Sequence, residues 1–290
     1  MIKFENVEIA GWRPAIRGMR NPKNSWEKSD SGVCATHGPD HCADCVYTDC
    51  HADDVEIGTK YILGPNDHDL TTRLSNAGTD HRKFMRMVAV YVDITAPLYW
   101  WKEFDTYKVG TVSNSCSTMH KIADKEFILD DFSHEHLLNM YNNAHGDALF
   151  LNGAPNIRVD GNDLLCLTIN VLNYYRKRYI ETKNKRYWWQ MIQLLPSSYN
   201  QKRTIMLNYE VLANIYKSRK SHKLDEWREF CEWIKSLPYS ELITHVVQKE
   251  DIQSNPIEDQ EMVNVYGQLI PKKDLKNSDS YSDPLFNGGV

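Results

Sequence analysis

The chain has 290 residues, of which 41% are hydrophobic and 25% charged, so it can form one large domain or two small ones with a sizeable core. It has 34 Lys and Arg against 39 Asp and Glu, and a formal net charge of −5 argues against a wholly basic nucleic-acid clamp. No stretch approaches the roughly 18 to 20 uninterrupted apolar residues of a membrane span, and the first residues lack the basic-then-apolar order of a signal peptide. We therefore expect a soluble, cytoplasmic protein.

The beginning of the chain predicts a strand, a polar segment and a helix. Apolar and charged residues alternate over residues 2–9, which indicates a short strand. Residues 20–60 are rich in Asn, Ser, Asp, His and Cys and show little apolar periodicity, so we expect a loop or a small inserted module there. Asn66 or Asp67 is then expected to cap a helix that stops at Gly78.

A strand that leads into a helix follows. Residues 87–94 form an apolar, β-branched run of strand length, and Pro97 suits the first turn of a helix over residues 98–106. The Trp100-Trp101 pair in that helix would either stack on a flat ligand or pack at the helix end. Residues 110–117 are small and polar, which predicts a loop or irregular strand close to the helix.

Helices dominate the prediction for the second half. Asp130 or Asp131 is expected to cap a helix that ends near Gly146. Further helices are predicted at residues 163–182, 184–194, 203–218 and 222–236. Cys166 and Cys231 fall in these helical patterns and are expected in the core.

Four of the seven cysteines lie close together in the polar segment, at Cys34, Cys42, Cys45 and Cys50. In a cytoplasmic chain such a cluster favours a structural zinc site over disulfides, because thiols stay reduced there and a polar loop needs a staple to become ordered. His37, His41 or His51 could replace one of the four cysteines as a ligand. The alternative is that these are ordinary reduced cysteines in a flexible insertion; a catalytic zinc is disfavoured, because four cysteines would close the coordination shell.

Residues 174–189 combine six cations with six aromatic residues. Cations that contact phosphates and rings that stack on bases are what single-stranded nucleic-acid binding requires. On a helix, however, the rings can be buried while the cations stay solvated. We favour this solvated face, with nucleic acid, a subunit contact or a phosphate site as alternatives.

Two segments together resemble the flavin-dependent thymidylate synthases. After the strand and Pro97, Thr106-Tyr107-Lys108 stands where that family carries Arg-His-Arg, and residues 111–120 resemble its loop S-x-N-x-x-S-x-R-Y. In residues 194–238, the stretch that begins at Asn208 is similar to the family's N-x-R-S-L helix. The resemblance covers about half of the chain.

The resemblance implies an α/β (α+β) fold with a central antiparallel or mixed sheet, flanking helices and a helical C-terminal half. Residues 1–245 would form this single domain, with the Cys/His-rich insertion at about residues 30–55, and residues 246–290 a loosely ordered tail. It also implies a homotetramer with FAD between subunits and a pyrimidine nucleotide stacked on the flavin. Methylene would come from methylenetetrahydrofolate and hydride from NADPH, without a cysteine nucleophile.

The resemblance also implies site residues, although it assigns no catalytic residue. The residues implied for cofactor binding are Thr106, Tyr107, Lys108, Arg203 and Asn208. The residues implied for substrate binding are Glu103, Asn114, Ser115, Cys116, Ser117 and Glu210.

The chain departs from the family pattern at charged positions. Lys108 supplies a single cation without the bidentate fork of an arginine, and Met119 replaces the arginine of the loop. Glu210 replaces the arginine of the helix and would repel a phosphate, which costs on the order of 1 kcal/mol in a half-buried site. Lys202, Arg203 and Arg219 could take over phosphate contacts.

Three functions are therefore expected from the sequence. The leading one is a divergent FAD-dependent methyltransferase that acts at C5 of a pyrimidine nucleotide or nucleoside. The second is a non-catalytic nucleotide or nucleic-acid binding protein with the same fold. The third is an interaction protein whose insertion at residues 30–55 recruits a partner.

Overall fold

The computed structural model describes residues 2–33, 61–138, 149–151 and 154–244, all within one unit, Met1–Val246. Most of the predicted insertion and the predicted tail after residue 245 lie outside these residues. Within the described part of the chain, no helix is both long and apolar enough to cross a membrane.

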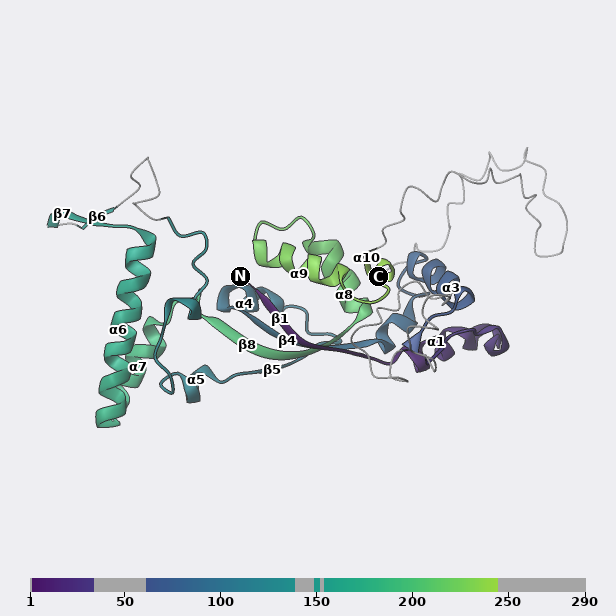
Figure 1. The fold of residues 1–290 in the computed structure, drawn as a ribbon, viewed down its shortest axis with the longest axis horizontal. Coiled ribbons are helices and arrows are strands. Elements are labelled where there is room, and N and C mark those ends of the chain that lie inside the picture. Colours follow the sequence, from purple (N-terminus) through teal and green to yellow (C-terminus); the bar gives the residue numbers. More distant parts are fainter. Residues whose placement is uncertain (1, 34–60, 139–148, 152–153, 245–290) are drawn as a thin grey trace, which may run out of the picture. The chain divides into compact units, whose positions relative to one another are not determined.

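The central element is a four-stranded antiparallel sheet with the strand order β1-β4-β8-β5 (Figure 1). Its strands are β1 (Lys3–Ala10), β4 (Ala89–Pro97), β5 (Val112–Ser115) and β8 (Asn200–Asn208). β4 and β8 pair without interruption from Ala89 opposite Asn208 to Pro97 opposite Asn200. β1 joins the other edge of β4, and β5 joins the other edge of β8. This sheet confirms the predicted fold class.

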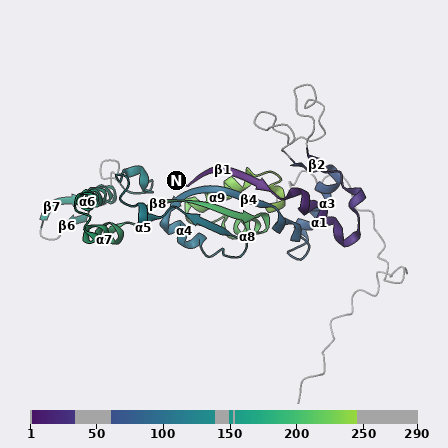
Figure 2. The same cartoon turned by 90° about the horizontal axis from the view of Figure 1, so that it is seen from below.

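The core lies on one face of the sheet. Along β4, Val90, Val92 and Ile94 are buried while Tyr91 between them is exposed, because successive side chains of a strand point to opposite faces. The buried face packs against α4 (Leu98–Phe104), α8 (Tyr209–Arg219) and α9 (Asp225–Lys235), which lie on the same side of the sheet (Figure 1). Seen from below, the strands cross in front of α8 and α9 (Figure 2).

The remaining described helices are α1 (Trp12–Arg20), α3 (Pro65–Asn76), α5 (Thr118–Lys121), α6 (Gly161–Thr182), α7 (Lys185–Leu194) and α10 (Glu241–Thr244). Short 3-10 turns occur at Asn21–Lys23, Trp26–Lys28, Lys83–Met87 and Leu129–Asp131. Two further strand pairs are β2 (Gly32–Val33) with β3 (Tyr61–Ile62), and β6 (Leu149–Leu151) with β7 (Ala154–Val159).

α6 and α7 pack together and carry a second, smaller core. Asp160 caps α6, since its side chain accepts a hydrogen bond from the Asp163 N–H at 2.8 Å. Leu172 of α6 and Met191 of α7 are fully buried, together with Phe132. Both helices agree with the predicted ranges.

Two helix predictions are wrong in part. Residues 203–208 belong to β8 and not to a helix. Their hydrogen bonds to β4 outweigh the helical preference of the local sequence. No helix follows Asp131 in the described residues up to 138: Phe132 bridges to Tyr199, and the Ser133 N–H donates to the Ser198 carbonyl at 2.8 Å. Cys166, expected in the core, is exposed on α6.

A buried ion pair joins α1 to α3. Arg20 Nε donates to Asp67 Oδ1 at 2.6 Å, and the side chains are only 5% and 0% exposed. The hydroxyls of Ser29 and Ser31 donate to the other carboxylate oxygen at 2.7 and 2.6 Å. Burial alone would raise the pKa of Asp67, but the hydrogen bonds from Ser31, Ser29 and Arg20 outweigh it and hold the pKa below its usual value.

We expect Asp67→Ala to lower the free energy of unfolding by about 3 kcal/mol, because it leaves Arg20 buried without its partner. Because the folded-state pKa is lowered, the stabilisation is complete above the ordinary pKa of about 4 and is lost as the pH falls through the folded-state value. Urea unfolding at several pH values should therefore show a steeper acid loss for the wild type than for Asp67→Asn.

The control is Asp69→Asn on the same helix, whose carboxylate pairs with Arg73 in an exposed ion pair at 2.8 Å. This variant should change stability by no more than about 0.5 kcal/mol. An Asp67→Ala variant as stable as the wild type would contradict the prediction.

Candidate functional site

The residues predicted to bind cofactor and substrate surround the end of α4 and the segment that follows it. The Thr106 hydroxyl donates a hydrogen bond to the Glu103 carbonyl at 2.8 Å, at the C-terminal end of α4. Gly110 then turns the chain with a φ of +77°, so close to α8 that a Cβ would lie 3.0 Å from Asn208 Nδ2. Asn208 itself caps α8, accepting from the Val211 N–H at 3.0 Å. The segment after α4 is thereby fixed against the start of α8.

Glu103 is the centre of a polar cluster between α4, α8 and α9. Its Oε2 accepts from Arg219 Nη1 at 2.9 Å and from Trp227 Nε1 at 3.0 Å, and it lies 3.6 Å from His222 Nε2. Arg219 Nε donates to the Tyr107 hydroxyl at 2.8 Å, and its guanidinium lies 4.6 Å from the centre of the Trp227 ring. Glu103 therefore holds both Arg219 and Trp227 in place.

Arg203 is the centre of a second cluster that joins β8 to α4 and β5. Its guanidinium lies over the Trp101 ring at 4.2 Å, Nε donates to Gln201 Oε1 at 2.9 Å, and Nη1 donates to Asp105 Oδ1 at 2.7 Å. Gln201 Nε2 in turn donates to the Cys116 carbonyl at 2.9 Å. The end of β5 is thus tied to the same arginine as the end of α4.

The four polar residues predicted to bind substrate lie at the end of β5: Asn114, Ser115, Cys116 and Ser117. In the sheet, β5 places the Ser115 backbone opposite Arg203, and the Cys116 N–H donates to the Lys202 carbonyl at 2.9 Å. Asn114, Ser115 and Cys116 are exposed, whereas the Ser117 hydroxyl accepts from the His120 N–H at 3.1 Å and caps α5. Three of the four are therefore accessible to a ligand.

Glu210 is paired and does not present a bare carboxylate. Arg82 Nε lies 2.7 Å from Glu210 Oε2 and Arg82 Nη2 lies 3.2 Å from Oε1, and the two side chains are 12% and 7% exposed. The expected repulsion of a phosphate by an uncompensated Glu210 is therefore reduced by an arginine from the segment before β4. Trp100 and Trp101 are 0% exposed and pack in the core, so of the two alternatives for this pair the structure shows packing and not stacking on a ligand.

Three comparisons with known proteins bear on this arrangement. No protein-family model matches the chain, and the comparison with curated proteins found no match. A solved structure of thymidylate synthase X from Helicobacter pylori with FAD and dUMP matches with a TM-score of 0.52 and 16% identity, over 84% of this chain and 97% of that one. Another complex of the flavin-dependent enzyme from H. pylori gives 0.51 and 17%, over 83% and 97%. The chain has the fold of the flavin-dependent thymidylate synthases.

A further match is the UMP/dUMP methylase PolB from Streptomyces cacaoi bound with 5-bromo-UMP, with a TM-score of 0.48 and 13% identity over 84% of this chain and 92% of that one. The thymidylate synthase fold confirms the resemblance, which was drawn from the order of elements and from Pro97, Asn114, Ser117, Pro196 and Asn208. The roles of the individual site residues stay predictions.

The sequence did not indicate the side chains that pair with Arg203 and Glu210. Asp105 and Gln201 bind Arg203, and Arg82 binds Glu210, although none of the three was predicted as a site residue. Arg82 and Glu210 lie 128 positions apart, and no local pattern links them. Asp105 could have been found, since it directly precedes the Thr106-Tyr107-Lys108 stretch.

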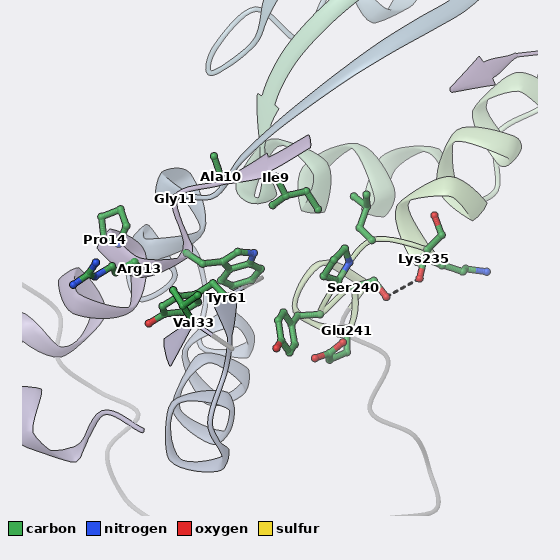
Figure 3. A pocket seen from close by; sticks show the side chains of 15 residues that line it. Ile9, Ala10, Gly11, Arg13, Pro14, Val33, Tyr61, Lys235, Ser240 and Glu241 are labelled. Carbon is green, nitrogen blue, oxygen red and sulfur yellow. Dashed lines mark hydrogen bonds between the residues drawn. The ribbon is translucent and has the colours of Figure 1, made fainter. Parts of the chain in front are cut away.

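Cavities in the described part of the chain are lined by residues outside these clusters. One of about 700 Å³ lies where β1 enters α1; Figure 3 shows Val33 and Tyr61 on one side of it and Ser240 and Glu241 on the other. The second, of about 550 Å³, is mostly apolar and is lined by residues that include Leu70, Leu74, Phe84, His81, Lys23 and Lys83. No predicted cofactor or substrate residue lines either cavity.

The predicted zinc ligands Cys34, Cys42, Cys45 and Cys50 lie outside the described residues. Among the residues that the structure describes, no group of three His, Cys, Asp or Glu side chains is placed to hold a metal ion.

We expect Gly110→Ala to lower the free energy of unfolding by more than the strain of a left-handed alanine, about 1 to 2 kcal/mol, because its Cβ would also crowd Asn208 Nδ2 and Val211 Cγ2, each at 3.0 Å. Gly78→Ala is the matched control, since Gly78 also has a positive φ of +99° but has nothing within 4 Å of an added Cβ. Thermal unfolding of both variants measures the difference. Equal losses of stability would show that Asn208 gives way without cost.

Proposed function

We propose that the chain is a flavin-dependent enzyme that transfers a one-carbon unit to C5 of a pyrimidine nucleotide or nucleoside. The observation that carries the proposal is that a chain with this fold brings the predicted cofactor and substrate residues together at the end of α4, the end of β5 and the start of α8. The two matching structures of the H. pylori enzyme, which has the same fold, hold FAD and dUMP. Reduced flavin, when bound, supplies the hydride that converts the transferred carbon to a methyl group.

The residues present fit a flavin nucleotide. Tyr107 offers a half-buried ring whose position is set by the hydrogen bond from Arg219. Lys108 is exposed and has no carboxylate partner among the described residues, so it is available for a phosphate.

The chain's own residues would orient the pyrimidine at the end of β5. Ser115 pairs with Arg203 in the sheet and lies on the same face, where its exposed hydroxyl matches a carbonyl or N–H group of a pyrimidine edge. Asn114 pairs with Thr204, and its exposed side chain lies on the opposite face of the sheet. Gln201 and Arg203 fix the backbone from which these side chains project. The donor of the one-carbon unit would be a folate, as the resemblance implies.

A homo-oligomer, as in the homotetramer implied by the resemblance, would complete this open site. The α6–α7 pair exposes six large apolar side chains in the monomer, namely Leu164, Leu167, Tyr174, Ile180, Trp189 and Leu194. Exposed apolar surface of this kind is typical of interaction sites. The zinc site at Cys34, Cys42, Cys45 and Cys50 stays part of the proposal, with a structural role.

We expect the purified protein to carry the visible absorbance of a flavin, or to acquire it when FAD is added. Lys108→Glu should weaken FAD binding at least about tenfold, because a lost hydrogen bond to a charged group is worth about 1.5 to 3 kcal/mol. Lys217→Glu is the matched control, since Lys217 is an exposed lysine of α8 that was not predicted to bind ligand. Fluorescence titration measures both.

The reaction itself is tested by incubating the flavin-loaded protein with methylenetetrahydrofolate, NADPH and pyrimidine nucleotides or nucleosides. Mass spectrometry should detect one added CH₂ on the pyrimidine. If the protein takes up no FAD, the proposed enzymatic function is wrong. The alternative is then a nucleotide or nucleic-acid binding protein, which is tested by salt-dependent binding of single-stranded oligonucleotides.

A further inference from the structure

Both arginines at the candidate site are neutralised by carboxylates from the end of α4. Arg203 Nη1 lies 2.7 Å from Asp105 Oδ1, and Arg219 Nη1 lies 2.9 Å from Glu103 Oε2. The arginine side chains are only 13% and 20% exposed. These carboxylates therefore compete for the guanidinium groups that a nucleotide phosphate would use.

The surroundings of each guanidinium leave a phosphate little room to replace the carboxylate. An indole covers one face of each, at 4.2 Å for Arg203 and 4.6 Å for Arg219. The Nε groups also have acceptors, Gln201 Oε1 at 2.9 Å and the Tyr107 hydroxyl at 2.8 Å. A phosphate would thus stand beside Asp105 or Glu103, where like charges repel.

The third arginine of this region is neutralised in the same way. Arg82 is paired with the nearly buried Glu210, so three arginines face three carboxylates around the site. Lys108 is exposed, and we propose that it binds the cofactor. An uncharged sugar hydroxyl, in contrast, can accept or donate hydrogen bonds beside a carboxylate without charge repulsion.

We propose that the substrate is a pyrimidine nucleoside without a 5′-phosphate, and that Glu103 and Asp105 are the residues that select against the phosphate. This inference rests on the proposed function, because it concerns the ligand of the same site. It assigns Glu103 and Asp105 to specificity and leaves the chemistry of the reaction unchanged.

The test compares uridine and 2′-deoxyuridine with UMP and dUMP by calorimetric titration of the full-length, flavin-loaded protein. We expect the nucleosides to bind at least tenfold more tightly than their monophosphates. Asp105→Asn should tighten monophosphate binding at least tenfold and leave nucleoside binding within twofold, because it releases Arg203 from a carboxylate without removing a hydrogen-bond acceptor. Glu103→Gln should likewise shift the preference toward the monophosphates. Circular dichroism shows whether each variant is folded.

Glu232→Gln is the control for net charge, since Glu232 pairs with Lys235 in an exposed ion pair on α9. It should leave the preference for nucleosides unchanged. If the wild-type protein binds the monophosphates more tightly than the nucleosides, the inference is wrong while the proposed function stands. This measurement does not depend on any variant. If no pyrimidine binds and no flavin is taken up, the proposed function fails together with the inference.

Discussion

The pairing of β4 with β8 is the constraint on which the rest of the structure depends. The two strands are antiparallel over their whole length, and each continues directly into a helix, β4 into α4 after Pro97 and β8 into α8 after Asn208. α4 and α8 therefore start from opposite ends of this strand pair, and both run back over the same face of the sheet. The end of α4 meets the end of α8, and the segment after α4 meets the start of α8.

This convergence explains how distant residues come to share one site. Arg219 and Glu103 lie 116 positions apart, and Arg203 and Asp105 lie 98 positions apart, yet both pairs form where α4 ends. The indoles of Trp101 and Trp227 support the two guanidinium groups from the core, so the arginines are fixed by packing as well as by charge. Burial of the tryptophans thus contributes to the geometry of the polar site.

The charges of the site differ from the pattern of the thymidylate synthases in a coordinated way. The resemblance places Lys108 where the family has two arginines and Glu210 where it has one, and Glu210 pairs with Arg82 from the segment before β4. Glu103, Asp105 and Glu210 each have an arginine partner. These three pairs carry no net charge, which is the basis for the proposed choice of an uncharged nucleoside.

Local patterns in the sequence determined the strand at residues 2–9, the strand that enters a helix at Pro97, and the helices α6 and α7, because these follow from apolar periodicity and from proline and cap chemistry near in sequence. The family resemblance, drawn from a few uncharged positions, correctly indicated the fold. Only the tertiary structure decided that residues 203–208 form a strand, since they gain their hydrogen bonds from β4 more than a hundred positions away. It also decided which charges pair at the site. Side-chain contacts such as Arg82 with Glu210 depend on how the helices pack over the sheet, and no local pattern in the sequence contains that information.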